Sequence, residues 1–439
     1  MKILLIYPGI GVKGFRKTYS TYMANIVFGI KNNSNGEFAW IHHGLALLGA
    51  ILKKEGHDVV LCDLRKQSGW ISFVEDLMKI NPDWVGITAS YLDTDAAKTC
   101  AKLIKQNLPN CKIVVGGLSP TLDTHIWDEP FIDHIITNEG EISLPKLING
   151  ELTDRVIKGI QPELSSLPYA DRDLYDYVYE LQSSFFPYQP KPMITMISAR
   201  GCPYQCTYCQ PAEQMVFGKG TRWRSVDHVI GELKELKMKY NFKSITWWDD
   251  TFTVNKKWLK EFCQKFNETF SGIEHLVNSR ADIISNDEEI VELLASIGVK
   301  YIEIGFETGS DRLLKFLKKG TTVEQNLKAA QLIKKHGMNI FGTFMLGLPT
   351  ETPEEAMMTY HMHRSIKPNK DIIFYFTPIP GTEIFKYCKD NDLILREDEL
   401  KIDRTGNYKP KIKGIDYSFL DEIRNKLEES CTHLAEVNS

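Results

Sequence analysis

The sequence predicts an α/β fold with two successive parallel sheets. The first is an N-terminal doubly wound, Rossmann-like sheet, and the second is a partial (β/α)6 barrel followed by a short helical segment. Two observations lead to this class: short apolar runs alternate with amphipathic stretches of helical period, and polar or glycine-rich residues follow many of the runs. Strands that alternate with helices form parallel sheets. The 439 residues suffice for two or three domains.

Residues 1–150 contain the pattern of the doubly wound sheet. The run Lys2–Tyr7 is almost continuously apolar, as in a strand that is buried on both faces. Leucines at helical spacing predict a helix over Gly44–Glu55, which closes at Gly56. We expect further strands at Val59–Asp63, Trp84–Thr88, Lys112–Val115 and His134–Thr137, and helices at Ile71–Lys79 and Asp95–Gln106.

The residues after these strands indicate a ligand site, because doubly wound sheets bind ligands beyond the carboxyl ends of their strands. Gly116-Gly117 lets the backbone approach a ligand closely, although a plain turn also uses such a pair. Gly9, Gly11 and Gly14 have the spacing G-x-G-x-x-G after the first strand, but the next helical pattern begins only at Gly44. The strand–turn–helix context of a dinucleotide site is therefore missing. We expect cofactor contacts from Pro8, Thr88, Ser90, Tyr91, Gly116, Gly117, Leu118, Asn138, Glu139 and Gly140.

Three clustered cysteines, Cys202, Cys206 and Cys209, have the spacing C-x3-C-x2-C. A 4Fe–4S cluster normally takes four Cys ligands. With three, one iron keeps an open position for a chelating substrate, by the logic that separates catalytic from structural zinc sites. Buried thiols, a zinc site that lacks one ligand, and chance are the alternatives. The other cysteines are scattered and form no second C-x2-C pair.

Residues 193–390 contain the second series of strands and helices. Polar residues gather after its strands, where barrel enzymes carry their chemistry. We expect strands at Ile194–Ser198, Ser244–Trp248, His275–Asn278, Tyr301–Phe306, Asn339–Leu346 and Asp371–Thr377. Helices are expected at Val226–Tyr240, Trp258–Thr269, Asp287–Ile297, Val323–His336 and Pro353–Ser365.

The cysteine stretch resembles the cluster-binding loop of the radical S-adenosylmethionine (SAM) enzymes, whose pattern is C-x3-C-x-aromatic-C. Tyr208 supplies the aromatic residue. The resemblance implies that SAM chelates the open iron through its amino and carboxylate groups. It also implies that an electron from the cluster cleaves SAM to methionine and a 5′-deoxyadenosyl radical, with Tyr208 near the adenine.

The same resemblance implies further SAM contacts in residues 193–390. Asp249 and Asp250 are expected to accept from the SAM ammonium, and Arg280 to pair with the SAM carboxylate. Glu307, in Glu307-Thr308-Gly309, is expected at the ribose, and Gly347 beside the adenine. The alternative for each is a helix cap or a surface ion pair.

The first region resembles the cobalamin-binding domain that precedes many radical SAM domains, with Glu139-Gly140-Glu141 after its last strand. The resemblance implies cobalamin as the cofactor. Many cobalamin domains carry a histidine after the first strand that ligates cobalt, but residues 8–41 contain none. We expect His42 and His43 to cap the following helix, and the lower face of cobalt to have no protein imidazole.

Three segments lie outside these two patterns. Residues 151–192 hold several prolines without sustained periodicity and are expected to form an ordered linker. The long loop 8–41 is expected either to cover the cofactor or line the substrate pocket, or to pack on itself. Residues 391–439 are expected to end in a helix at Tyr417–Ala435, too short a tail for an RNA-binding barrel, which counts against the methylthiotransferases.

The composition indicates which binding partners and which cellular location to expect for the protein. The net charge of −4 gives no basic footprint for nucleic acid. No apolar run reaches the roughly 18 residues of a membrane-spanning helix. Scattered cysteines suit a reducing cytoplasm, and the radical SAM resemblance implies an external electron donor such as flavodoxin or ferredoxin.

These observations favour a cobalamin-dependent radical SAM methyltransferase that acts on an unactivated carbon of a small molecule or natural-product intermediate. In the scheme that the resemblance implies, methylcobalamin supplies the methyl group and a 5′-deoxyadenosyl radical activates the carbon. One alternative is a cyclase or rearrangement enzyme that uses both cofactors without net methylation. Another, of a different class, is a cobalamin or iron–sulfur sensor.

Overall fold

The structure is a computed structural model that describes residues 1–8, 41–91, 93–175, 181, 188–395 and 411–437. Most of the loop 8–41 therefore lies outside the described residues. The chain forms two compact units, the first built mainly from Met1–Pro187 and the second from Tyr188–Pro211, Lys219–Asp403 and Tyr408–Ser439. Within the described residues no helix has both the length and the apolar character needed to cross a membrane.

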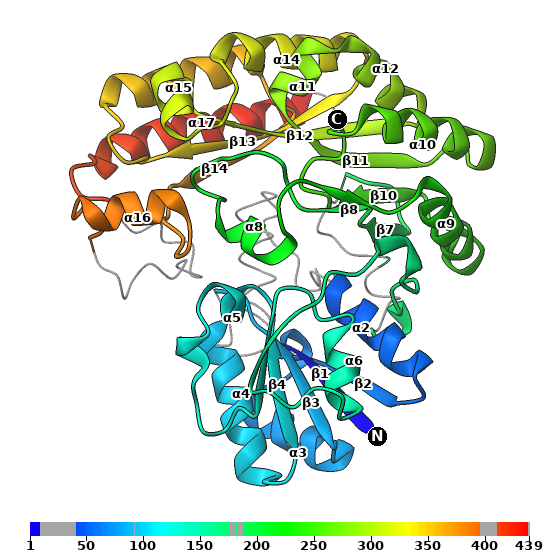
Figure 1. Cartoon of the computed structure of the whole chain (residues 1–439). Helices are drawn as coiled ribbons and strands as arrows, with labels where there is room; N and C mark the ends of the chain where they lie inside the picture. Colours follow the sequence, from blue (N-terminus) through cyan, green and yellow to red (C-terminus); the bar gives the residue numbers. More distant parts are fainter. Residues whose placement is uncertain (9–40, 92, 176–180, 182–187, 396–410, 438–439) are drawn as a thin grey trace. The chain divides into compact units, whose positions relative to one another are not determined.

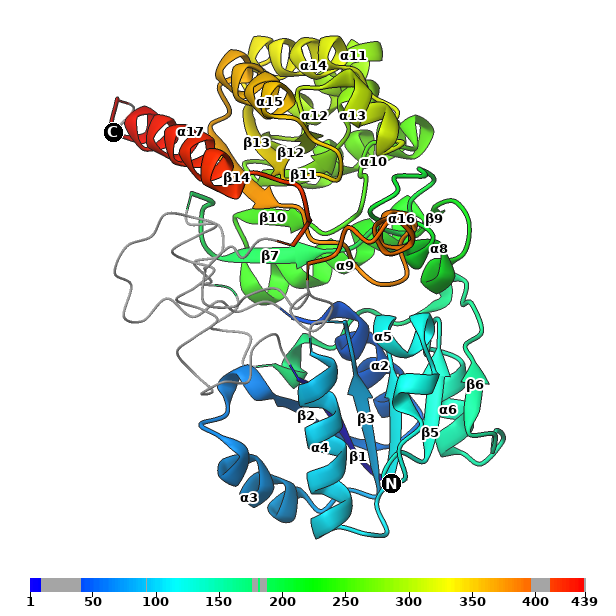
Figure 2. The same ribbon diagram turned by 90° about the vertical axis from the view of Figure 1, so that its left-hand side faces the viewer.

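The first unit is built on a parallel sheet of six strands in the order β2-β1-β3-β4-β5-β6 (Figure 1 labels β1 to β4, Figure 2 labels β5 and β6). The order reverses between β1 and β3, the kind of switch point at which doubly wound sheets bind ligands. The strands are β1 (Lys2–Tyr7), β2 (Asp58–Asp63), β3 (Trp84–Thr88), β4 (Lys112–Gly116), β5 (His134–Thr137) and β6 (Val156–Lys158).

Alternate residues of β1 point into two separate cores, which explains its continuous apolar run. Leu4 and Ile6 pack with α3 and α4, whereas Ile3 and Leu5 pack with α2 and α6. Both faces of the sheet are therefore covered, as in a doubly wound fold. The helices of this unit are α2 (His43–Lys54), α3 (Trp70–Ile80), α4 (Thr94–Asn107), α5 (Leu118–Leu122), α6 (Ser143–Ile148) and α8 (Ala212–Phe217).

Strand β6 lies in the segment that the sequence indicated as a linker without periodicity. It has three residues, of which Ile157 alone is buried, so its alternation is too short to recognise in the sequence. It pairs with β5, and Gly159 N donates to Thr137 O at 2.9 Å just beyond it. Short 3-10 helices lie at Leu64–Lys66, His125–Trp127, Leu164–Ser166 and Arg172–Leu174.

The second unit contains a parallel sheet of six strands in the order β14-β13-β12-β11-β10-β7 (Figure 2). Strands follow one another in sequence order across the sheet, which is the topology of a partial barrel. The strands are β7 (Met193–Met196), β10 (Ser244–Trp247), β11 (Glu274–Ser279), β12 (Val299–Glu307), β13 (Asn339–Leu346) and β14 (Lys370–Tyr375). Strands β8 (Ala199–Arg200) and β9 (Arg222–Trp223) form a separate antiparallel pair.

Helices cover one face of this sheet with aromatic packing. Trp247 of β10 contacts Phe262 of α10 at a centroid distance of 5.4 Å, and Phe344 of β13 contacts His363 of α15 at 4.9 Å. We call this the outer face. The helices of the second unit are α9 (Val226–Tyr240), α10 (Lys256–Thr269), α11 (Ala281–Asn286), α12 (Glu288–Ser296), α13 (Asp311–Phe316), α14 (Val323–Lys335), α15 (Pro353–Ile366), α16 (Glu383–Asp390) and α17 (Tyr417–Val437).

The structure confirms the predicted fold class. Strands β1, β3, β5 and β13 and helix α9 have the predicted limits, and the other predicted elements differ by one to three residues. The sequence did not predict α5, α6, α8, α11, α13 and α16, each of which has eight residues or fewer. Helices of about two turns carry too little period to stand out from their neighbours.

Candidate active site

Residues 201–211, here called the cysteine loop, follow the short strand β8. Cys209 N donates to Cys206 O at 3.0 Å, which closes a turn inside the loop. Thr207 N donates to Leu317 O at 2.9 Å, so the end of helix α13 fixes the loop from outside. The backbone therefore holds the three predicted cysteines in one loop of defined shape.

The three thiols of the cysteine loop lie within electrostatic range of one another. Desolvation, followed by the Cys206 thiol and more weakly Cys202, raises the pKa of Cys209. Among the described residues, no three side chains of Cys, His, Asp or Glu are close enough to share a single metal ion. Three thiolates in one loop are the donor set of a 4Fe–4S cluster in which one iron keeps an open coordination position.

Arg280, at the end of β11, lies against the cysteine loop. Its guanidinium stacks 3.5 Å from the ring centroid of Tyr204, and its Nη1 donates to Cys206 Sγ at 3.7 Å. Nε donates to Asp282 Oδ1 at 2.9 Å, and Nη2 donates to Lys319 O. Each of the three nitrogens has a protein partner, but a guanidinium has five N–H groups, so one N–H on each terminal nitrogen is still available for a SAM carboxylate.

Tyr208 of the cysteine loop is bonded to a buried ion pair. Its hydroxyl donates to Glu307 Oε1 at 2.9 Å, and Lys319 Nζ lies 2.7 Å from that oxygen and 3.0 Å from the Tyr208 hydroxyl. Glu307 and Lys319 are both buried. A low-dielectric pair of this kind is costly unless all its hydrogen bonds are made. The triangle therefore fixes the tyrosine ring beside the cysteines.

The backbone at Glu307 has the left-handed conformation, with φ of 63°. The β12–β13 register shifts between Gly305 and Glu307, as at a β-bulge. A Cβ at Gly305 would lie 2.2 Å from Glu307 Oε1 and 2.9 Å from Lys319 Nζ. The bulge thus turns the carboxylate over a glycine that leaves room for it, which is how bulges re-aim side chains near functional sites.

Asp249 holds the β7–β8 corner rather than facing open space. Its Oδ1 accepts from Ser198 N at 2.8 Å and Ala199 N at 2.6 Å, and its Oδ2 accepts from Ser198 Oγ at 2.9 Å. Burial raises the pKa of Asp249 to about 7 despite these three bonds. Of the predicted acidic pair, Asp250 is the exposed member.

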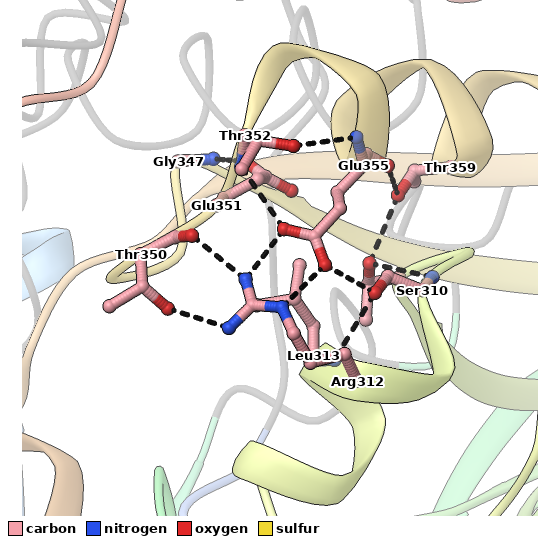
Figure 3. A network of polar contacts seen from close by, with 10 residues as sticks. Ser310, Arg312, Leu313, Gly347, Thr350, Glu351, Thr352, Glu355 and Thr359 are labelled. Carbon is pink, nitrogen blue, oxygen red and sulfur yellow. Dashed lines mark hydrogen bonds and ion pairs between the residues drawn. The ribbon is translucent and has the colours of Figure 1, made fainter.

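A clamp joins the segment after Glu307 to the loop after β13 (Figure 3). Arg312 donates from Nε and Nη2 to both oxygens of Glu355, at 2.8 and 2.6 Å, and from Nη1 to Thr350 Oγ1 at 3.1 Å. Ser310 Oγ donates to the same carboxylate at 2.6 Å. The Arg312 bond is the main cause that lowers the pKa of Glu355 to about 2. The clamp ties α13 and α15 together.

Gly347, predicted beside the adenine, and Gly309, which follows Glu307-Thr308, are both explained by packing contacts. A Cβ at Gly309 would lie 2.3 Å from Met358 O, so this glycine lets its backbone touch α15. Gly347 has φ of 75°, and a Cβ there would meet Tyr417 at 3.4 Å. Gly347 N donates to Glu351 Oε2 at 2.6 Å. The turn after β13 therefore has its own structural reasons for glycine.

In the first unit, hydrogen bonds join the ends of β3 and β4. Ala89 N donates to Gly116 O at 2.8 Å, and Ser119 N donates to Ala89 O at 2.9 Å. Gly117 has φ of 103°, and a Cβ there would lie 2.9 Å from Ala89 O. Close approach of two protein backbones, rather than open space, is what requires glycine at this position.

Asn138, after β5, adopts a left-handed conformation with φ of 59°. Its backbone N–H donates to Thr121 Oγ1 at 2.8 Å, and its Nδ2 donates to the carbonyl oxygens of Met215 and, at 3.4 Å, Val216 in α8. Pro8 and Glu139 are buried, while the predicted contacts Thr88, Ser90, Tyr91, Gly116 and Leu118 are half-buried. A Cβ at Gly140 would lie 3.8 Å from the Leu48 side chain of α2, which is an ordinary packing distance.

His42 caps helix α2, as the sequence predicted for this residue. Its Nδ1 accepts from Leu45 N at 3.2 Å, and its backbone N–H donates to the Tyr175 hydroxyl at 3.1 Å. Burial, and then the charge of Arg65, lowers the pKa of His42 to about 4. The imidazole is therefore neutral, with one nitrogen used inside the protein.

Sequence reasoning missed Lys319 and Tyr204. Lys319 follows another lysine in Lys318-Lys319-Gly320, a run that reads as a solvated surface. Tyr204 lies between two of the cysteines, and its contact is with Arg280, 76 positions later. Only the fold brings these residues together, so no local pattern identifies them.

Comparison with known families agrees with this geometry. Residues 196–363 match the Radical SAM superfamily, and residues 32–148 match the B12 binding domain. The first match includes the cysteine loop, Arg280 and Glu307, and the second includes the strand ends around Gly117 and Asn138.

Curated relatives that match most of the chain also include enzymes of this kind. An uncharacterized methyltransferase of Pyrococcus horikoshii is 30% identical over 80% of this chain and 79% of its own. An anaerobic magnesium-protoporphyrin IX monomethyl ester cyclase of Rubrivivax gelatinosus is 27% identical over 80% of this chain and 66% of its own.

A solved structure has the same fold. The radical SAM methyltransferase TsrM of Kitasatospora setae, solved with cobalamin and a 4Fe–4S cluster bound, gives a TM-score of 0.67 at 17% identity, covering 89% of this chain and 75% of that one. The family predicted from the cysteine loop and the first sheet is confirmed. The chain belongs to the cobalamin-binding enzymes of the radical SAM superfamily, whose cofactors are a 4Fe–4S cluster, SAM and cobalamin.

Proposed function

We propose that the protein methylates an unactivated carbon of a small molecule or natural-product intermediate. This proposal rests on the combination of a B12 binding domain and a radical SAM domain in one chain. The chain is also 30% identical to a relative named a methyltransferase. When bound, the cofactors supply one-electron cleavage of SAM and a transferable methyl group. The remaining work is positioning, which belongs to the side chains of this chain.

In this proposal Cys202, Cys206 and Cys209 hold the cluster. The Arg280 guanidinium, 3.7 Å from Cys206 Sγ, stabilises the thiolate form of that ligand by charge and hydrogen bonding. Tyr208 is held by Glu307 and presents its ring to the adenine.

The remaining SAM contacts are proposed for the rim of the second sheet. Asp250 accepts from the ammonium, while Asp249 keeps the β7–β8 corner in shape. Glu307 contacts the ribose and Gly347 lies beside the adenine. Arg280 reaches the SAM carboxylate from its place at the cysteine loop.

For cobalamin we propose the strand ends of the first unit. Their half-buried backbone and side chains after β3, β4 and β5 are the available surface at the carboxyl edge. The proposed contacts are Pro8, Thr88, Ser90, Tyr91, Gly116, Gly117, Leu118, Asn138, Glu139 and Gly140. We place the cobalamin domain at residues 1–150 and add strand β6 of the linker to it. The rest of the linker extends to residue 192. The radical SAM core spans 193–390, and a helical segment spans 391–439.

The proposal extends to the surroundings of the enzyme. A flavodoxin or ferredoxin is the proposed electron donor, because reduction of a low-potential cluster needs such a carrier. The described cysteines form no disulfide with one another, which supports a reducing, cytoplasmic location. The net charge of −4 supports a small-molecule substrate rather than nucleic acid.

The test uses reconstituted holoenzyme, a strong reductant and SAM with a deuterated methyl group, incubated anaerobically with a metabolite extract. We expect one compound of the extract to gain a labelled methyl group, with 5′-deoxyadenosine formed alongside. The relatives named as cyclases give the second candidate function its support. Consumption of a compound with 5′-deoxyadenosine but without label would favour it, and would contradict methylation.

A further inference from the structure

Strand β12 presents different residues to its two faces. Ile302, Ile304 and Phe306 are fully buried toward the outer face, where Phe306 O accepts from Asn326 of α14. The alternating residues Tyr301, Glu303 and Gly305 are half-buried and point to the opposite, inner face. A carboxylate in the middle of a strand therefore faces the interior of the partial barrel.

The position of Glu303 along the strand is bounded by two groups of residues. Toward the carboxyl end, the Glu307 carboxylate and Lys319 ammonium cover Gly305 and contact Tyr208 of the cysteine loop. Toward the amino end, the Tyr301 ring lies 4.3 Å from that of Tyr188. Glu303 is thus one layer below the proposed SAM contacts and one layer above an aromatic pair.

In the part of the chain that the structure describes, no hydrogen bond or ion pair reaches the Glu303 carboxylate. Burial, and then the like charge of Glu307, raises the pKa of Glu303 to about 7. Glu303 is half-buried, so its carboxylate loses part of its hydration without gaining a donor from the described residues. A purely structural role gives no reason to keep such a group, and residues of this kind are typical of binding sites.

A second acceptor lies beside it on the neighbouring strand. Asn278 of β11 is in register with Glu303, so the two side chains are on the same face. Asn278 Nδ2 donates to Asp249 O at 3.1 Å, while the buried Asn278 Oδ1 has no partner among the described residues. Two neighbouring strands thus offer acceptors, and no donor in the described part of the chain satisfies them.

We propose that Glu303 and Asn278 bind a cationic, N–H-bearing group of the substrate, such as a protonated amine or a guanidinium. This inference rests on the proposed function, because it places the substrate inside the partial barrel below the SAM contacts. A cationic nitrogen gives Glu303 the charge-assisted hydrogen bond it lacks and gives Asn278 Oδ1 a donor. A carboxylate or phosphate at the same place would meet the Glu303 carboxylate, whereas Glu307 is already paired with Lys319, so an anionic group is disfavoured there.

The binding test needs no catalysis, so it can fail independently of methyl transfer. Phenethylamine and 3-phenylpropanoate, which differ mainly in the sign of their charge, are titrated into anaerobic holoenzyme. We expect the amine to bind at least about tenfold more tightly, which corresponds to about 1.4 kcal/mol. Glu303→Gln should remove this preference, and the control Glu324→Gln, at an exposed carboxylate of α14, should keep it.

The pH dependence gives a second readout. Amine binding by the unaltered protein should strengthen from pH 6 to pH 8, as Glu303 loses its proton, and this dependence should be absent from Glu303→Gln. The other charged or titratable groups near this layer are Glu307, Lys319, Tyr188, Tyr301 and Lys370. Glu303→Gln leaves each of them in place.

The stability of the variant separates binding from structure. Glu303→Gln should unfold at the same temperature as the unaltered protein or higher, and it should keep the cluster absorbance. Equal binding of the two probes, binding of neither, or a Glu303→Gln protein with the unaltered charge preference would each overturn the proposal. So would a large fall in its unfolding temperature, because that would show a structural role.

Discussion

Two adjacent lysines form ion pairs that differ in burial, one buried and one exposed. Lys319 pairs with Glu307 at 2.7 Å where both side chains are nearly inaccessible, whereas Lys318 pairs with Glu383 at 2.7 Å where both are about half exposed. Loss of one partner of a buried pair costs about 3–5 kcal/mol, because the other charge stays buried. An exposed pair contributes about 0–1 kcal/mol.

We therefore expect Lys319→Met to lower the free energy of unfolding by about 3 kcal/mol or more, and Lys318→Met by less than about 1 kcal/mol. Urea denaturation followed by circular dichroism measures both. Similar losses from the two variants would mean that the Tyr208–Glu307–Lys319 triangle does not hold the site.

His42 is the histidine nearest to the first strand among the described residues, and its Nδ1 is occupied by the α2 cap. We expect the cobalamin of the resting protein to have no protein imidazole on cobalt, and its nucleotide base to be displaced as well. The electron paramagnetic resonance spectrum of cob(II)alamin should lack nitrogen splitting. A three-line splitting that His42→Ala abolishes would refute this expectation.

At the scale of elements, the Arg312–Glu355 clamp joins α13 to α15. Because the pKa of Glu355 is lowered to about 2 in the folded state, its contribution is present above the unfolded pKa of about 4.5 and is lost as the pH falls toward 2. We expect Glu355→Gln to cost about 2–3 kcal/mol at pH 7. The gap to the unaltered protein should narrow between pH 5 and pH 3.

Glu354→Gln is the matched control, since Glu354 is exposed one position earlier in the same first turn of α15. It should change stability by less than about 0.5 kcal/mol. If the two variants were equally stable at pH 7, the clamp would have no role in joining the helices.

The long elements were predictable because their apolar pattern records which face is buried. Lys2–Tyr7 and Asn339–Leu346 are examples in which the apolar run ends where the strand ends. Helices such as α13 and α16 were not predictable, because six to eight residues span barely two turns. Strand β6 depends on pairing with β5 rather than on its own sequence.

The residues of the candidate site also fall into two groups, those that the sequence reveals and those that only the fold reveals. The spacing of the cysteines is a local pattern and was visible in the sequence. Lys319 is 111 positions from Tyr208 and 12 from Glu307, so only the fold reveals their contact. Asp249 was expected at SAM from a family pattern, but the structure uses its oxygens on Ser198 and Ala199, which sequence alone does not specify.

At the scale of the whole molecule, we propose one cofactor site for each unit, on its parallel sheet. In both, the relevant residues follow the carboxyl ends of strands, where backbone groups are not used by the sheet. The first unit has its switch point between β1 and β3, and the second has its cysteine loop after β7 and β8. This arrangement suits a reaction that needs a methyl donor and a radical source.

The most direct test of the central claim is the yield of 5′-deoxyadenosine from SAM by anaerobically reconstituted protein under reduction. We predict turnover by the unaltered protein and by Cys263→Ala, whose buried thiol lies in α10. The variant with Cys202, Cys206 and Cys209 all changed to Ala should make none and should lose the absorbance of the cluster. Undiminished 5′-deoxyadenosine formation by that variant, or none by the unaltered protein, would contradict the account.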